Sequence, residues 1–298
     1  MTGKPTIGWM GIGKLGLPIA ARIAEAGYQV TAYDPAPGRL GLAAERGIIA
    51  ATAPEETAGQ DIVFSCLPHD KALLSATLGE RGLIALMRKD AIFAETSTIS
   101  PEASAEIGRA AESLGRAYLR LPISGNASIA HTGNLACFAS GPRAAFDAVQ
   151  PVLAAFTRAQ TYLGTGEQAR YAKLAVNLMI AATAVVMGES LALARKGNIG
   201  WRDMLDALAD SAVASPMVKY KAGPMAARDF SSTFSCHQMV KDLDLILGAA
   251  HGAGVHAPIA AQIRETYGAI IALGGGEADF MEAVRHTELL SGLGEPEQ

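Results

Sequence analysis

Short apolar runs alternate with longer, alanine-rich segments along the first half of the chain. Residues 6–10 form an apolar run that ends at a glycine, and residues 18–26 are typical of a helix. A second apolar run, "YQVTAYD", follows Gly27. Because parallel strands present their carboxyl ends to one crevice, runs that end in small polar residues predict a parallel sheet flanked by helices. Three more runs of this kind occupy residues 61–68, 91–101 and 117–125.

The turn after the first run carries a glycine motif. Gly11, Gly13 and Gly16 have the GxGxxG spacing, which permits a tight turn, close approach of a pyrophosphate, and close contact between helix and strand. Asp34 ends the second run, where its carboxylate can accept hydrogen bonds from both adenosine ribose hydroxyls and would repel a 2′-phosphate. The motif therefore predicts NAD, with NADP as an alternative because Arg39 is near; a tight turn without a ligand is the other interpretation. The predicted cofactor residues here are Gly11, Ile12, Gly13, Lys14, Leu15, Gly16 and Asp34.

The second half of the chain has a different pattern. Residues 141–156 predict one more helix and "TYLG" one more short strand, but from Glu167 to Lys196 the pattern is helical without proline. Nearly all later segments also indicate helices. We therefore predict an α/β fold in two domains: a Rossmann-type, doubly wound dinucleotide-binding domain over residues 1–163, and an all-α substrate and dimerisation domain over residues 164–298 that begins with one long helix.

Composition and charge narrow the partners. The chain has 298 residues, half of them hydrophobic, which suffices for a large core and exceeds the usual size of one domain. A net charge of −4 with scattered basic residues argues against nucleic acid or an anionic membrane, and favours a small-molecule partner. Three distant cysteines predict a reducing compartment and no metal site. Because no secretory signal is evident and Asn177, Gly188 and Glu189 interrupt the longest apolar stretch, we expect a soluble cytoplasmic protein without a membrane span.

Six motifs together resemble the β-hydroxyacid dehydrogenase family, which includes 3-hydroxyisobutyrate dehydrogenase, tartronate semialdehyde reductase and the glyoxylate/succinic semialdehyde reductases. They occur in the family's order from Ile7 to about Phe280. The motifs are "IGWMGIGKLG" at Ile7, "LP" at Leu67, "TSTISP" at Thr96, "LPISGNASIAHTGNLACFASG" at Leu121, "KLAVN" at Lys173 and "KDLDLILGAAHGAGVHAPI" at Lys241.

The resemblance implies specific roles for site residues. It implies that Lys173 is the general acid/base and that Asn177, one helical turn later, faces the same substrate. A lysine can take the proton of an alcohol if burial and nearby positive charge lower its pKa from ~10.4 towards neutrality. Without the resemblance, a helical lysine is interpreted as a solvated surface charge. The implied substrate-binding residues are Ser124, Gly125, Asn126 and Lys241, and the implied cofactor contacts are Leu67, Pro68, Thr98 and Lys241.

The chain also departs from the family pattern. Many members have Asp where this chain has Arg120 followed by Leu121, and Glu167 and Ala169 occupy two usual glycine positions before the catalytic lysine. These departures predict a substrate entrance of different shape and charge. A decarboxylating relative would carry a glutamate where this chain has Ile180, which argues against a decarboxylation step. For Lys241, pairing with a neighbouring aspartate at the helix end is the alternative interpretation.

Three functional hypotheses follow. The first is NAD-dependent hydride transfer between the cofactor and a small hydroxy acid or the matching semialdehyde or keto acid. The second is imine reduction on the same fold, although known imine reductases commonly replace the lysine. The third is a catalytically inactive NAD-binding sensor, which has no physical need for Lys173, Asn177, Ser124 and Lys241 together. The resemblance also implies a homodimer or homotetramer that forms through the long helix and the apolar second half.

Overall fold

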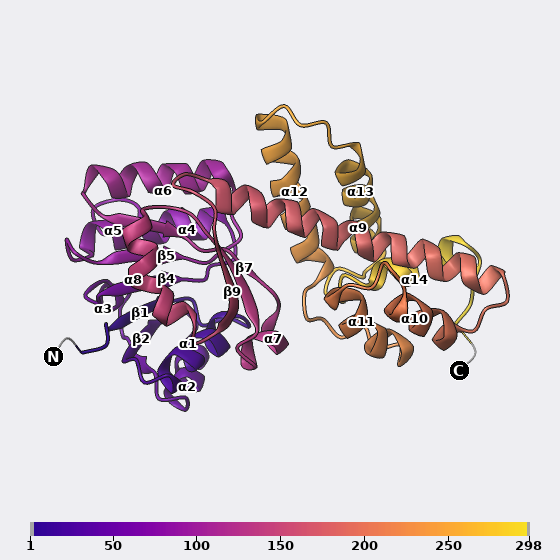
Figure 1. Cartoon of the computed structure of the whole chain (residues 1–298), viewed down its shortest axis with the longest axis horizontal. Helices are drawn as coiled ribbons and strands as arrows, with labels where there is room; N and C mark the ends of the chain where they lie inside the picture. Colours follow the sequence, from indigo (N-terminus) through magenta and orange to yellow (C-terminus); the bar gives the residue numbers. More distant parts are fainter. Residues whose placement is uncertain (1–2, 297–298) are drawn as a thin grey trace. The chain divides into compact units, whose positions relative to one another are not determined.

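A six-stranded parallel sheet forms the centre of the amino-terminal half of the protein (Figure 1). The computed structural model describes residues 3–296. Its strand order is β3-β2-β1-β4-β5-β6, the doubly wound order that the alternating pattern predicts. The prediction of a Rossmann-type sheet is therefore confirmed. The strands are β1 (Ile7–Met10), β2 (Val30–Tyr33), β3 (Ile49–Ala50), β4 (Ile62–Ser65), β5 (Ile92–Glu95) and β6 (Ala117–Arg120).

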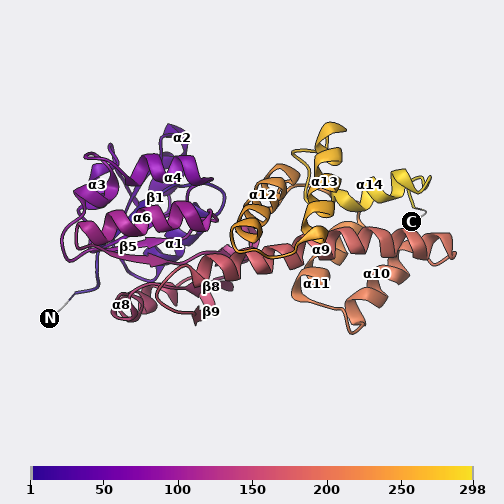
Figure 2. The ribbon, with the colours of Figure 1, turned by 90° about the horizontal axis from the view of Figure 1, so that it is seen from above.

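Helices cover both faces of this sheet, and strand periodicity decides which side chains they meet. Ile7 and Trp9 of β1 pack in a core with α1 and α8, whereas Met10 packs in a second core with α6. Figure 2 shows α6 and α8 on opposite sides of the sheet. The helices are α1 (Gly16–Glu25), α2 (Pro37–Ala44), α3 (Glu55–Ala58), α4 (Asp70–Thr77), α5 (Leu83–Leu86), α6 (Pro101–Ser113), α7 (Ala127–His131) and α8 (Arg143–Leu153).

A second, smaller sheet follows the large one. It has the order β7-β8-β9, with β7 (Ile123–Ser124) antiparallel and β9 (Thr157–Tyr162) parallel to β8 (Leu135–Ala139). This sheet ends the α/β part of the chain and places Ser124, a predicted substrate residue, at the end of β7.

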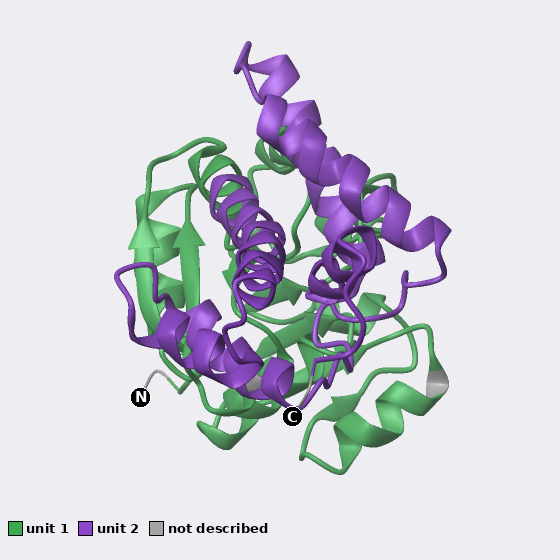
Figure 3. Cartoon of the chain, turned by 90° about the vertical axis from the view of Figure 1, so that its right-hand side faces the viewer, with its two compact units in different colours: residues 1–173 green, residues 174–298 purple. Residues whose placement is uncertain are grey.

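The remainder is helical, as predicted. Helix α9 (Gln168–Lys196) is the longest, and the later helices pack around one apolar core. The chain divides into two compact units, residues 1–173 and 174–298, which Figure 3 colours separately. This division falls inside α9, ten residues beyond the predicted boundary, because Arg170 in the first turn bonds to unit 1. The later helices are α10 (Trp201–Asp210), α11 (Pro216–Ala226), α12 (Cys236–Gly252), α13 (Pro258–Ala272) and α14 (Glu282–Leu290).

Helix α9 has an unusually apolar exposed side. Met179, Val186 and Leu193, spaced seven residues apart, are 68%, 57% and 76% exposed. The opposite side, with Ala181 and Leu191, lies in the core of unit 2. By length and composition alone, α9 is long and apolar enough to cross a membrane. The core helix of a soluble protein can pass the same test.

Candidate active site

The glycine turn after β1 has the geometry that a dinucleotide requires. Gly11 has a φ of 95°, and a Cβ there would lie 2.3 Å from the Cys66 carbonyl oxygen. A Cβ on Gly16 would lie 2.0 Å from the Gly11 carbonyl oxygen, so α1 touches the turn closely. Gly13 differs, because apart from the glycine itself and its two chain neighbours no heavy atom lies within 4 Å of its Cβ position. The turn therefore leaves open space at the Cβ position of Gly13, three residues before the first residue of α1, which is where this motif holds a pyrophosphate in dinucleotide-binding proteins.

Asp34, directly after β2, is fixed against this turn. Its Oδ2 accepts the Ile12 N–H at 2.8 Å, and its Oδ1 accepts the Ala36 N–H at 2.9 Å. An ionised carboxylate has about four acceptor positions, so both oxygens keep capacity for ribose hydroxyls. The carboxylate is thus placed for the predicted role in cofactor binding, which stays a prediction.

The loops after β4 and β5 are joined at the same edge of the sheet. The Leu67 N–H donates to the Ser97 hydroxyl at 2.7 Å, and Asp70 accepts the N–H and the hydroxyl of Ser100 at 3.0 and 2.5 Å. These bonds hold the predicted cofactor residues Leu67 and Pro68 beside the loop that carries the half-buried Thr98. The structure therefore brings together, within unit 1, the loops that were predicted from separate motifs.

The loop after β7 contains the predicted carboxylate-binding residues. Gly125 has a φ of 133°, a region that favours glycine, and a Cβ there would lie 2.5 Å from Leu135 Cδ2. Asn126 caps α7, because its Oδ1 accepts the Ile129 N–H at 3.1 Å. This capping role was not predicted, and it fixes the loop in which Ser124 and Gly125 lie.

Lys173 and Asn177 are both buried at 7% exposure. The interpretation of Lys173 as a solvated surface charge is therefore wrong. The two residues lie four positions apart in α9, where side chains share a helix face. A buried lysine is rare in proteins without a specific reason, which makes this position a candidate for chemistry.

Asp242 contacts two of the predicted site residues, although the sequence indicated it only as an alternative ion-pair partner of Lys241. It is 2% exposed, and its Oδ2 accepts the Asn177 side-chain amide at 2.5 Å. Its Oδ1 lies 2.8 Å from the Lys241 ammonium nitrogen. Lys241 therefore does pair with a neighbouring aspartate, and that aspartate also holds Asn177. Asp244 instead pairs with Arg264.

The two charged departures from the family pattern pair with each other. The Arg120 Nε donates to Glu167 Oε1 at 2.7 Å, and the Arg120 guanidinium lies 4.5 Å from the centre of the Tyr118 ring. Because the two charges are opposite, the pair adds no net charge at this point.

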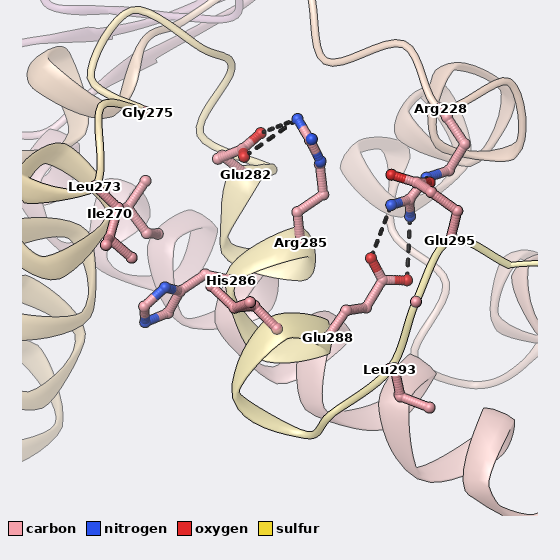
Figure 4. Close-up of a pocket in the computed structure, with 12 residues that line it drawn as sticks. Arg228, Ile270, Leu273, Gly275, Glu282, Arg285, His286, Glu288, Leu293 and Glu295 are labelled. Carbon is pink, nitrogen blue, oxygen red and sulfur yellow. Dashed lines mark hydrogen bonds and ion pairs between the residues drawn. The ribbon is translucent and has the colours of Figure 1, made fainter.

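A pocket of about 340 Å³ lies in unit 2 (Figure 4). It is lined by α13, α14, the loop between them, the tail after α14, and Arg228 just after α11, and none of the predicted site residues lines it. The carboxylates in it are paired, Glu288 with Arg228 and Glu282 with Arg285, whereas His286 points away from both pairs. Burial raises the pKa of Glu282.

The described residues contain no candidate metal site, and two of the three cysteines are buried thiols. Within residues 3–296, no group of three His, Cys, Asp or Glu side chains could hold a metal ion. Burial raises the pKa of Cys236 to about 12 and raises that of Cys137 further, so these thiols stay protonated and unreactive.

Comparison with known proteins identifies the family. Residues 6–164 match the model for the NAD binding domain of 6-phosphogluconate dehydrogenase, and residues 166–287 match the model for NAD-binding of NADP-dependent 3-hydroxyisobutyrate dehydrogenase. The chain belongs to the β-hydroxyacid dehydrogenase family. As a member of this family, it is an NAD-binding oxidoreductase.

Relatives from three branches match nearly the whole chain. The solved structure of Mycobacterium tuberculosis 3-hydroxyisobutyrate dehydrogenase with L-serine has a TM-score of 0.85 and 26% identity, over 95% of this chain and 99% of that one. The 2-hydroxy-3-oxopropionate reductase of Escherichia coli is 26% identical over 96% and 98%. The chloroplastic glyoxylate/succinic semialdehyde reductase 2 of Arabidopsis thaliana is 25% identical over 95% and 79%.

Proposed function

We propose that this protein interconverts a small hydroxy acid and the corresponding semialdehyde or keto acid, with NAD as cofactor and Lys173 as proton-transfer group. The observation that carries the proposal is the burial of Lys173 together with Asn177, four residues later on α9. Asp242 adds support, because one carboxylate holds both Asn177 and Lys241.

The chemistry needs a hydride and a proton. A bound nicotinamide supplies the hydride in reduction and accepts it in oxidation. In reduction Lys173 donates a proton to the carbonyl oxygen as the alcohol forms, and in oxidation it takes the hydroxyl proton. Asn177 donates a hydrogen bond to the same oxygen, and Asp242 restricts the orientations of its amide.

Cofactor binding is assigned to unit 1. The open space at Gly13 would receive the pyrophosphate of a bound cofactor, and Asp34 would accept its ribose hydroxyls. Because its carboxylate would repel a 2′-phosphate, we propose NAD rather than NADP. A higher rate with NADPH than with NADH at equal concentration would contradict this preference.

The predicted substrate-binding residues are polar or positively charged, which supports a carboxylic acid as substrate. Within unit 1, Ser124 and the backbone N–H groups after β7 suit a carboxylate. Within unit 2, Lys241 carries the positive charge that the resemblance assigns to substrate binding. The names of the three relatives refer to short acids that carry a hydroxyl or carbonyl group. This shared chemistry supports a short carboxylic substrate and does not select one acid.

We also propose that the protein forms a homodimer or homotetramer through the exposed apolar side of α9. Burying Met179, Val186 and Leu193 against a second copy would remove their apolar surface from water. Light scattering at micromolar concentration should report a dimer or tetramer, and a monomer would contradict the proposal. Co-sedimentation of the protein with neutral lipid vesicles would instead favour a membrane role for α9.

The test is a panel of short semialdehydes, keto acids, hydroxy acids and cyclic imines, assayed with NADH and NADPH or their oxidised forms. We expect turnover of at least one short acid, and loss of that turnover in Lys173→Met. Lys196→Met, an exposed lysine at the end of the same helix, is the matched control and should keep wild-type activity. Turnover of an imine alone would indicate an imine reductase, and NADH binding without any turnover would indicate a sensor.

A further inference from the structure

Arg170, in the first turn of α9, is one of the most deeply buried charged residues of unit 1. Its side chain is 1% exposed and forms an ion pair with Glu95 at the end of β5. The guanidinium also donates to the Ser97 carbonyl oxygen at 2.8 Å, the Tyr118 hydroxyl at 3.0 Å and the Ser104 hydroxyl at 3.2 Å. One side chain therefore connects α9 to β5, β6, α6 and the loop after β5.

Glu95 extends these contacts towards the predicted cofactor loops. Its Oε1 accepts the Ser97 N–H at 2.6 Å and lies 3.4 Å from the Ser65 hydroxyl. The Ser97 hydroxyl in turn accepts the Leu67 N–H. The same ion pair that holds the start of α9 thus also fixes the loops that carry Leu67 and Thr98.

Lys173 lies three residues after Arg170 on the same helix. Residues three apart are neighbours on a helix surface, and a helix moves as a rigid element over one turn. A shift of the Arg170 backbone would therefore move the Lys173 backbone by a similar distance. Misplacing a reacting group by about 1 Å can reduce a rate by roughly a hundredfold.

Stability alone does not account for this pair. Moving two charges out of water is costly, and well-packed apolar residues in their place are often equally or more stable. Burial would lower the pKa of Arg170, but Glu95 and Tyr118 raise it above its ordinary value, so the guanidinium stays charged. What an apolar pair would lack is the set of directed hydrogen bonds, which fixes one arrangement of helix and loops.

We propose that Arg170 is a positioning residue, which through Glu95 and Ser97 sets the location of Lys173 relative to the loop that carries Thr98. This inference rests on the function proposed above, since it assigns to Arg170 the placement of the proton-transfer group. It concerns the proton-transfer step, and not the affinity for either ligand.

The test compares two buried ion pairs, each replaced as a pair. Glu95→Gln/Arg170→Met removes both charges, while the amide oxygen keeps an acceptor for the Ser97 N–H. Lys221→Met/Asp279→Asn is the matched control, because this pair in unit 2 is also buried, with side chains 6% and 3% exposed. For both variants we would measure the melting temperature, the NADH dissociation constant, kcat and KM.

The first variant should lose roughly a hundredfold in kcat. The changes in NADH affinity and KM should be much smaller, because the amide oxygen at position 95 still accepts the Ser97 N–H that holds the cofactor loop. The control variant should keep kcat. A folded, NADH-binding Glu95→Gln/Arg170→Met protein with wild-type kcat would overturn the proposal, because the pair would then be structural only.

Arg170→Lys decides the case if the double variant does not fold. A lysine keeps the positive charge beside Glu95 but lacks the planar fork that reaches Ser97 and Tyr118 together. We expect near-normal melting with a reduced kcat. Wild-type kcat in a folded Arg170→Lys protein would overturn the proposal.

A readout independent of turnover separates this inference from the proposed function. Absence of turnover by the wild type on every substrate would contradict the proposed function alone. The acetylation rate of Lys173 by acetic anhydride, followed by peptide mass spectrometry, should then rise several-fold in both Arg170 variants. Lys196 acetylation is the internal reference and should not change. An unchanged Lys173 rate would overturn the positioning role.

Discussion

Glu95–Arg170 in unit 1 and Lys221–Asp279 in unit 2 are two buried ion pairs with similar local chemistry. Asp279, like Glu95, accepts further hydrogen bonds: one from the Thr233 N–H at 3.0 Å and one from the Met281 N–H at 3.1 Å. The pairs differ in what they connect. The first joins the turn before Lys173 to predicted cofactor loops, and the second joins α11 to two loops without a predicted site residue.

Under the roles proposed here, burial and complete pairing would be common to a functional and a structural ion pair, so the neighbouring residues must decide between the two roles. Both pairs avoid the cost of an unpaired buried charge in the same way. The two pairs differ in whether predicted site residues lie next to them. The comparison therefore assigns a kinetic role to one pair and a structural role to the other, and these roles can be measured separately.

Lys221→Met should give the largest effect on stability. It leaves the Asp279 carboxylate buried without its cation, which should lower the free energy of unfolding by about 3–5 kcal/mol. Chemical denaturation measures this change, and kcat per folded molecule should stay at the wild-type value. A lowered kcat in the folded fraction would break the comparison, because the pair in unit 2 would then also affect the reaction.

Gly13→Ala sharpens the comparison in unit 1, since it tests a ligand site without a charge change. The added methyl group meets no protein atom within 4 Å, so the melting temperature should not fall. It would occupy the space assigned to the pyrophosphate, and we expect NADH binding to weaken roughly fiftyfold, about 2.3 kcal/mol. Fluorescence titration measures the affinity. Unchanged binding would show that the turn does not hold the dinucleotide.

Asp242→Asn should have a smaller effect, and we expect it on the catalytic efficiency kcat/KM. The change removes the charge that holds Lys241 and weakens the contact with Asn177, and we expect kcat/KM to fall about tenfold, or 1.4 kcal/mol. Asp244→Asn is the control, because Asp244 is exposed and pairs with Arg264. Equal losses in both variants would indicate a general charge effect and not a site role.

Replacing Glu282 should give the smallest effect, visible only as a change in how the free energy of unfolding depends on pH. Burial raises its pKa above the ordinary value of 4.5, so the folded protein retains this proton at a pH where the unfolded chain has lost it. Stability should therefore fall as the pH rises from about 4.5 through the raised pKa. Denaturation curves at several pH values should show this slope in the wild type and a weaker slope in Glu282→Gln.

Local patterns in the sequence predicted the elements with strong local signals. The apolar runs and the glycine spacing predicted the main strands and the turn at Gly11. Two strands, β3 and β8, were not predicted. β3 has only two residues, both exposed, and β8 reads "LACFA", whose two alanines carry little strand preference.

The buried polar networks were outside the reach of sequence patterns. Arg170 and Glu95 are 75 residues apart, and Asn177 and Asp242 are 65 residues apart. No local period connects such residues, because only the folded chain brings them together. The ion pair between Arg120 and Glu167 was likewise not predicted, although both residues were singled out as departures from the family pattern.

The most direct test of the central claim is a single-turnover measurement of hydride transfer. Wild-type protein and Lys173→Met would each be saturated with NADH and mixed with the best substrate of the panel, while NADH absorbance is followed. We expect both proteins to bind NADH equally and the variant to oxidise it roughly a thousandfold more slowly. Equal rates in the two proteins would contradict the assignment of Lys173 as the proton-transfer group.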